Sequence, residues 1–314
     1  SKIEGVTSFC HVLTESNTTH KSVPMLLSPV SAQNFDSIYY RKSIITAFKE
    51  AGFQTAFFSN QRYNHSFIDF FGMEADTYDF IKEDSQDSQY NPSDDELLML
   101  VEKELEKGNR KQFIVLHTYG SHFNYRERYP ETVAFFLPDF PVDAEVKYKD
   151  NLMNAYDNSI RYTDNFLARI IHLLKQQQVD ASMLYTSDHG EDIFDDGRHL
   201  FLHASPVPSY YQLHVPLLLW TSDSYREEYP GIEKAASMNR QKNISSSISF
   251  FQTMMELAGI ETPYRNDSLS VTSPLYTEKS RVYLNDHNEP HSLDDIGMRK
   301  EDFEMLKKRG IDAQ

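Results

Sequence analysis

The stretch Met183-Leu184-Tyr185-Thr186-Ser187-Asp188-His189-Gly190-Glu191 joins a short apolar run to a polar turn. The apolar residues predict a buried strand, and the Asp-His pair then lies where that strand gives way to a loop, which is where open α/β sheets bind ligands. Carboxylate and imidazole are good zinc ligands, and adjacent residues on a sharp turn are able to reach one ion. The stretch therefore predicts a metal site. The alternative is a turn capped by Asp188 beside an ordinary, partly buried His189.

Apolar runs alternate with amphipathic segments along the rest of the chain. Strands are predicted at residues 6–13, 53–58, 112–116, 183–185, 215–220 and 281–284, and helices at 41–51, 94–107, 148–178, 245–257 and 300–309. This alternation predicts an α/β fold, a three-layer α/β/α sandwich around a mostly parallel sheet. The polar segment 74–95 predicts a long surface loop. Ser22 is expected to cap a short helix that has Pro24 in its first turn.

Composition narrows the classes of function. The chain has 314 residues and a net charge of -16, and this acidic balance argues against a nucleic-acid partner. Its single cysteine, Cys10, excludes an internal disulfide, and no apolar run approaches the length that crosses a bilayer. Because Ser1 is neither an initiator Met nor part of a targeting pattern, we expect a fragment or processed form of a longer protein.

Further histidines and hydroxyls lie at other predicted strand ends and helix starts. His117 and His122 follow the predicted strand at 112–116. His203 follows the stretch at residues 183–191, and Thr18 and Thr19 precede a predicted helix. Each has an ordinary explanation when it is taken alone, as a core histidine, a loop residue or a helix cap. Metal sites, however, are built from such residues gathered from separate loops. The combination favours a shared site.

Five segments together resemble a known family. They are Thr18-Thr19-His20-Lys21-Ser22-Val23-Pro24, His117-Thr118-Tyr119-Gly120-Ser121-His122, Tyr156-Asp157-Asn158-Ser159-Ile160, Ser187-Asp188-His189-Gly190-Glu191 and Phe201-Leu202-His203. In this order and at these separations they resemble the catalytic domain of bacterial phosphoethanolamine transferases, which decorate lipid A and related envelope glycans. Those enzymes belong to the alkaline phosphatase and sulfatase superfamily. The resemblance covers residues 5–260, and the combination is more specific than any one motif.

The resemblance implies roles for individual residues. The family's nucleophilic threonine, which also binds metal, lies five positions before the proline and falls on Thr19, with Thr18 as the fallback. The zinc-binding pair falls on Asp188 and His189. His122 and His203 then face the substrate phosphate or a second zinc ion, and Asn60 and Gln61 lie near the substrate. His117 and Glu191 are further candidate site residues.

The implied reaction is a double displacement. Phosphoethanolamine passes from a phosphatidylethanolamine-like donor to Thr19 and then to a lipid A or glycan acceptor. Zn²⁺, at one site or two, would activate the threonine hydroxyl and offset phosphoryl charge. The resemblance also implies a single catalytic domain over residues 1–314, at the periplasmic face of the bacterial inner membrane, and a part in polymyxin resistance. Its membrane association would come through an N-terminal region absent from this sequence.

Two departures and several alternatives remain. The family's further zinc ligand is a Glu upstream of the nucleophile, which we expect to precede Ser1, together with the first strand; Glu15 is the less favoured substitute. The lipid A enzymes carry disulfides, and none flanks Thr19.

A sulfatase needs a Cys/Ser-x-Pro-x-Arg signature, which Cys10-His11-Val12-Leu13-Thr14 lacks. A lipoteichoic acid synthase-like phosphoglycerol transferase and a noncatalytic binding domain with an incomplete metal site stay open. Asn17-Thr18-Thr19 matches the glycosylation pattern, which we interpret as chance.

Overall fold

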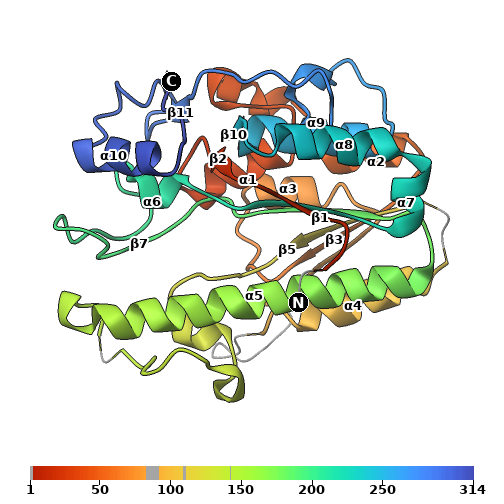
Figure 1. Ribbon diagram of the computed structural model, residues 1–314. Coiled ribbons are helices and arrows are strands. Elements are labelled where there is room, and N and C mark those ends of the chain that lie inside the picture. Colours follow the sequence, from red (N-terminus) through yellow and green to blue (C-terminus); the bar gives the residue numbers. More distant parts are fainter. Residues whose placement is uncertain (1–2, 83–91, 109–110, 142) are drawn as a thin grey trace. The chain divides into compact units, whose positions relative to one another are not determined.

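A computed structural model describes residues 3–82, 92–108, 111–141 and 143–314 (Figure 1). The chain divides into two compact units. The first comprises Ser1–Ala51, Gln178–Glu191 and His203–Gln314, and the second comprises Gly52–Gln177 and Asp192–Leu202. The single catalytic domain over residues 1–314 stays a prediction.

The first unit is built on a sheet with the strand order β1-β9-β6 and on the parallel pair β2–β10. Strand β9 runs antiparallel to both of its neighbours. The strands are β1 (Val6–Phe9), β2 (His11–Leu13), β6 (Ser182–Thr186), β9 (Leu217–Thr221), β10 (Asn243–Ser245), β11 (Tyr283–Leu284) and β12 (Pro290–His291). The helices are α1 (Thr19–Leu26), α2 (Ile44–Glu50), α6 (Tyr210–Leu213), α7 (Asp223–Glu228), α8 (Pro230–Asn239), α9 (Ser246–Leu257) and α10 (Lys300–Lys308), with 3-10 turns at Ala32–Tyr40 and Asp267–Leu269.

Helices α8 and α9 cover this sheet. Helix α8 contacts β1, and helix α9 contacts β6. Apolar side chains of the strands and of these helices form one buried cluster, which includes Val12, Leu217, Leu219, Ala236 and Leu257. Burial of apolar side chains is the main force that holds such layers together. The cluster fixes the strands whose ends carry the candidate site.

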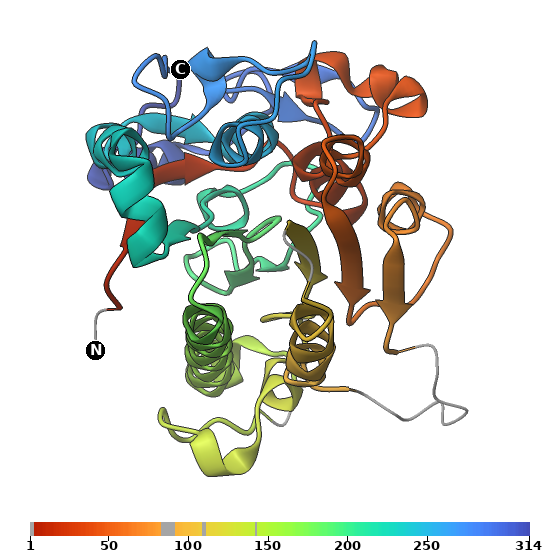
Figure 2. The same ribbon diagram turned by 90° about the vertical axis from the view of Figure 1, so that its right-hand side faces the viewer.

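The second unit has a parallel sheet with the strand order β4-β3-β5. Its helices α4 and α5 contact one another and are seen end-on, side by side, in Figure 2. The strands are β3 (Gln54–Ser59), β4 (Thr77–Phe80), β5 (Gln112–His117), β7 (Asp192–Ile193) and β8 (Phe201–Leu202). The helices are α3 (Phe67–Gly72), α4 (Glu96–Leu105) and α5 (Lys149–Gln177), with 3-10 turns at Tyr125–Arg128, Glu131–Val133 and Val146–Tyr148.

Most of the predicted elements are confirmed. The single strand predicted over residues 6–13 is divided into β1, which pairs with β9, and β2, which pairs with β10, and two further local expectations are wrong. Residues 74–95 are not one loop, because Thr77–Phe80 pairs with β3 as a parallel edge strand; residues 83–91 lie outside the described residues. Ser22 does not cap α1. The helix begins three residues earlier, at Thr19, with Thr18 as its N-cap, and the Ser22 hydroxyl donates to the Thr18 carbonyl at 2.7 Å. Of the helices that the structure describes, none is long and apolar enough to cross a membrane.

Candidate active site

Thr19 is the first residue of α1, and its hydroxyl points at the Asp-His motif. The Thr19 Oγ1 atom lies 3.1 Å from Nε2 of His189. Thr18, the N-cap, has extended backbone angles, and the helix runs for eight residues. Unpaired N–H groups at a helix start favour negative charge nearby. The half-buried Thr19 side chain therefore lies where a developing oxyanion is stabilised.

The Asp188-His189-Gly190 turn begins two residues after the end of β6, and hydrogen bonds to its own backbone hold it. The Thr14 hydroxyl donates to the Asp188 carbonyl at 2.8 Å, and the Gly190 N–H donates to the Gln212 carbonyl at 2.8 Å. A Cβ atom on Gly190 would lie only 2.1 Å from the carbonyl oxygen of Tyr211. Only glycine permits this close approach, so the turn needs its third residue to lack a side chain.

The ring of His189 is oriented by its own turn. Its Nδ1 atom lies 3.0 Å from the Gly190 carbonyl oxygen. Because a carbonyl only accepts, Nδ1 carries the proton of this hydrogen bond, and Nε2 of the neutral ring offers a lone pair. Nε2 faces Thr19 Oγ1 at 3.1 Å and the buried Oδ2 atom of Asp188 at 3.4 Å. The oxygens of Thr19 and Asp188 thus both lie within 3.4 Å of this nitrogen.

This geometry fits a zinc ion. Ligand atoms about 2.0–2.1 Å from a tetrahedral zinc lie about 3.3 Å from one another. The separations of 3.1 and 3.4 Å around His189 Nε2 match that spacing. The second nitrogen of the ring donates to a backbone carbonyl, which is the usual way a metal-binding histidine is held. The donor set of hydroxyl, carboxylate and imidazole also suits zinc.

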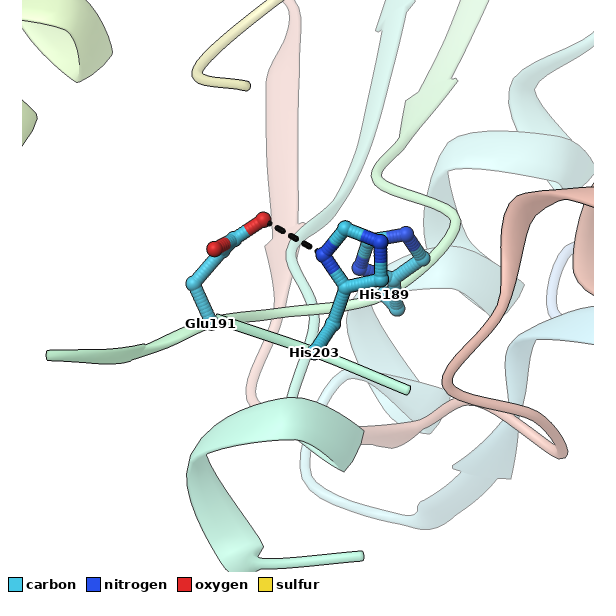
Figure 3. Close-up of side chains that lie close together, drawn as sticks. All are labelled: His189, Glu191 and His203. Atoms are coloured by element: carbon cyan, nitrogen blue, oxygen red, sulfur yellow. Dashed lines mark hydrogen bonds and ion pairs between the residues drawn. The ribbon is translucent and has the colours of Figure 1, made fainter. Parts of the chain in front are cut away.

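Glu191 and His203 form a second pair beside His189. Glu191 Oε1 lies 2.8 Å from His203 Nδ1, as the dashed line in Figure 3 marks. The rings of His203 and His189 overlap, with centroids 4.0 Å apart. Burial alone lowers the pKa of His203, but the hydrogen bond and charge of Glu191, with the charge of Asp188, outweigh it and raise the pKa above its usual value.

His189, Glu191 and His203 also form a group that could hold a metal ion. Each offers one ligand atom, and these atoms all lie within 4.8 Å of one another. His189 belongs to both sets of converging atoms. In the first unit, then, the structure brings together five of the residues that the sequence singles out: Thr19, Asp188, His189, Glu191 and His203.

The other candidates belong to the second unit. His117 ends β5, and its Nδ1 atom lies 3.1 Å from Ser59 Oγ at the end of β3. Asn60 is buried and donates to Asp94 Oδ1 at 2.8 Å, while Gln61 is half-buried. His122 Nδ1 lies 2.6 Å from the Phe123 carbonyl oxygen. Asn60, Gln61 and His117 thus gather at the carboxyl ends of β3 and β5.

Glu15 lies outside the group of possible metal ligands. Its Oε2 atom accepts from the Ala32 backbone N–H at 2.8 Å, and only 1% of the residue is exposed. Burial raises the pKa of Glu15 to about 7, opposed by the Ala32 hydrogen bond and the charge of Arg281. Its role as the missing zinc ligand gains no support from this geometry.

The sequence did not single out three buried residues that hold the site together. Asn17, Gln212 and Tyr283 connect the loop before Thr19 to the segment after His203. The position of Asn17, two residues before Thr19, could have pointed to a role in the site. The pattern Asn17-Thr18-Thr19, however, matches a glycosylation site, which is typical of a surface residue. Burial of Asn17, at 1% exposure, excludes a glycan there.

The family follows from comparison with known proteins. The model of the sulfatase family matches residues 2–260, and the chain therefore belongs to the sulfatase family. Its fold is the α/β fold of the alkaline phosphatase-like proteins.

Within that family the chain resembles phosphoethanolamine transferases. It is 36% identical over 157 residues to phosphoethanolamine transferase EptA of Escherichia coli K12, covering 48% of this chain and 28% of that protein. It is 29% identical over 288 residues to the putative transferase YhbX of the same strain, covering 90% and 47%. The chain thus spans less than half the length of these curated relatives.

Solved structures share the fold. The C-terminal periplasmic domain of Escherichia coli EptC in complex with Zn matches with a TM-score of 0.83 at 23% identity, covering 94% of this chain and 83% of that chain. The lipoteichoic acid synthase LtaP of Listeria monocytogenes matches with a TM-score of 0.56 at 16% identity, covering 97% and 81%.

Proposed function

We propose that the chain is the catalytic domain of a zinc-dependent phosphoethanolamine transferase with Thr19 as its nucleophile. The donor is a phosphatidylethanolamine-like lipid, and the acceptor is a hydroxyl or phosphate of lipid A or an envelope glycan. The domain works at the periplasmic face of the inner membrane in this proposal, and the description of the EptC structure as a periplasmic domain supports the periplasmic location. His203, which lies beside His189, contacts the transferred phosphoryl group in this proposal, and the role of His122 stays a prediction.

The convergence of Thr19, Asp188 and His189 carries the proposal. The hydroxyl oxygen of Thr19 lies 3.1 Å from His189 Nε2, and a carboxylate oxygen of Asp188 lies 3.4 Å from the same nitrogen. Free threonine hydroxyls are weak nucleophiles, because they are almost fully protonated near neutral pH. Zn²⁺ bound by these three residues would supply the Lewis acid that lowers the pKa of the hydroxyl and offsets phosphoryl charge. The N-terminus of α1 at Thr19 adds an electric field that, like the zinc ion, favours negative charge.

Two displacements transfer the group. In the first, Thr19 Oγ1 forms a bond to the phosphorus of the donor, the bond from phosphorus to the diacylglycerol oxygen breaks, and that oxygen receives the proton that Thr19 loses. In the second, an acceptor oxygen bonds to the same phosphorus, the Thr19–phosphorus bond breaks, and the acceptor proton returns to Thr19. Glu191 holds His203 beside His189 throughout, through the 2.8 Å contact with its Nδ1 atom.

The phosphoglycerol transferase alternative uses the same kind of site with another lipid headgroup. The fold match to LtaP at 16% identity supports the shared architecture alone, whereas the relatives with the higher sequence identity are named for phosphoethanolamine. A noncatalytic binding domain would keep the fold without zinc or turnover. Headgroup choice and metal content therefore separate the three readings.

Headgroup release tests the proposal. Vesicles of phosphatidylethanolamine and of phosphatidylglycerol, each with a labelled headgroup, are incubated with the zinc-loaded protein and its Thr19 variants. We expect release from phosphatidylethanolamine, a loss of at least about 1,000-fold in Thr19→Ala, and residual activity in Thr19→Ser. Both variants should remain folded. Preferred release of phosphoglycerol would favour the synthase-like alternative, and a folded, metal-free, inactive protein would favour the binding domain.

A further inference from the structure

Asn17 is buried between three segments of the first unit. It lies in the loop before Thr19, and only 1% of it is exposed. Its Nδ2 atom donates to the Ser205 carbonyl at 2.9 Å and to Gln212 Oε1 at 2.6 Å. Its Oδ1 atom accepts from the Tyr283 hydroxyl at 2.7 Å. A single side chain thus joins the nucleophile loop to the segment after His203, to α6 and to β11.

The orientation of this amide is fixed by its partners. A backbone carbonyl only accepts, so the Nδ2 group of Asn17 must face Ser205 and the oxygen must face Tyr283. Gln212 is fixed in the same way: its Nε2 atom donates to Ser205 Oγ at 3.0 Å, and its Oε1 atom accepts from Asn17. Buried polar networks in which each member has its partners specify one arrangement.

The network reaches both halves of the candidate site. The Asn17 carbonyl accepts from the Ala204 N–H at 3.2 Å, directly after His203, and the Gln212 carbonyl accepts from the Gly190 N–H at 2.8 Å, directly after His189. Ala204 has a φ of 60°, a left-handed conformation that a residue with a side chain adopts at a cost. External contacts are needed to hold such a backbone.

We propose that Asn17 is a positioning residue that sets Thr19, His189 and His203 in register, with Gln212 and Tyr283 as its supports. The inference rests on the proposed function for its kinetic readout. Asn17 acts through hydrogen bonds, because both the nitrogen and the oxygen of its amide are bonded to other groups of the protein. A displacement of about 1 Å at a reacting group costs about 100-fold in rate, so the register of these segments matters.

The sharpest variant is Asn17→Asp, which keeps the size and shape of the side chain. It places a carboxylate oxygen against the Ser205 carbonyl, where two acceptors repel. Asn239→Asp is the matched control: Asn239 is also 1% exposed, and its Nδ2 donates to the carbonyls of Val271 and Ser273 at 3.0 and 2.8 Å. Each variant loses two buried hydrogen-bond donors. Only Asn17 belongs to the network that reaches the candidate site.

The experiment measures Tm, zinc affinity, and kcat and KM for headgroup release in both variants and in Tyr283→Phe. We expect similar losses of Tm in the two Asp variants, but a fall in kcat and in zinc affinity of about 10–100-fold in Asn17→Asp alone. Tyr283→Phe should lower kcat by a smaller factor at unchanged KM, and it decides the matter if Asn17→Asp does not fold. Equal kcat and equal zinc affinity in Asn17→Asp and Asn239→Asp, or wild-type kcat in Tyr283→Phe, would overturn the inference. If the wild-type protein binds zinc but turns over no lipid, the proposed function fails. The zinc affinities of Asn17→Asp and Asn239→Asp then still test the positioning role of Asn17.

Discussion

The Thr19 hydroxyl lies 3.1 Å from His189 Nε2, although 170 positions separate the two residues in the sequence. The Thr14 hydroxyl fastens the loop after β2 to the Asp188 carbonyl, at 2.8 Å. Thr19 starts α1 a few residues later, and His189 follows β6. A nucleophile from one loop and a metal-ligand pair from another are thereby brought together at one place in the first unit.

Asp188→Asn should weaken zinc binding. The amide keeps the size of the side chain but loses the negative charge that faces His189 Nε2 at 3.4 Å. Changes in groups that merely support a metal ligand cost about 10–100-fold in affinity, so loss of a ligand charge should cost at least about 100-fold. Competition with a chelator measures this affinity.

The exposed Asp294→Asn variant serves as the control for removal of one negative charge. It should bind zinc as the wild-type protein does. Chelation should lower Tm in the wild-type protein and in this control, since an ion at 100 times its Kd stabilises the fold by about 2.7 kcal/mol. Equal zinc affinity in Asp188→Asn and Asp294→Asn would rule out Asp188 as a ligand.

Gly190→Ala should destabilise the protein through a steric clash. The added Cβ atom would lie 2.1 Å from the Tyr211 carbonyl oxygen and 3.4 Å from that of His214. Backbone has to shift, and such overpacking costs about 1–3 kcal/mol. Gly197→Ala is the control, because a Cβ atom at Gly197 meets nothing within 4 Å. Chemical denaturation compares the two variants, and equal stabilities would refute the clash.

The motif at residues 183–191 shows what sequence can and cannot predict. A strand that ends in Asp188-His189-Gly190 was recognisable, since apolar runs and turn residues are local signals. Its relation to Thr19 came from a family resemblance, because contacts across 170 positions leave no local pattern. Asn17 was missed because nothing in its local pattern marks a buried amide, and only tertiary packing shows that it is buried.

Secondary structure followed the same division. The long helix α5 was predicted almost to the residue from its apolar stripe, whereas the short strand β4 was not. Thr77–Phe80 is a short edge strand of mixed polar and aromatic residues, and it forms by pairing with β3. The start of α1 at Thr19 instead of near Ser22 likewise depends on the loop that carries Thr18.

Glu15 should make stability depend on pH. Burial raises its pKa to about 7 in the folded protein, from 4.5. The folded state therefore holds the proton more tightly than the unfolded state, and stability falls as pH rises from about 4.5 to about 7 and then stays level. The expected contribution is on the order of 3 kcal/mol across this window.

Glu15→Gln removes this titration while keeping an oxygen that accepts from the Ala32 N–H. The free energy of unfolding, measured by denaturation at pH 5 and at pH 8, should then change less with pH than in the wild-type protein. An identical pH dependence in the two proteins would show that Glu15 does not titrate in this range.

Glu191 should act through the orientation of His203. Glu191→Ala removes the acceptor that lies 2.8 Å from His203 Nδ1, and we expect kcat for headgroup release to fall about 10–100-fold. Glu191→Gln keeps an oxygen acceptor and loses only the charge, so its loss should be smaller. Steady-state kinetics distinguish the two variants, and wild-type kcat in Glu191→Ala would contradict the assignment.

The central claim is that Thr19 carries the phosphoethanolamine group, and peptide mass spectrometry after an acid quench tests it most directly. In the zinc-loaded wild-type protein incubated with phosphatidylethanolamine, fragmentation of the peptide that contains residues 18–24 should place the added phosphoethanolamine on Thr19. The peptide from Thr19→Ala should carry no adduct, and that from Thr18→Ala should still carry it. An adduct on Thr18, or on the Thr19→Ala protein, would contradict the account.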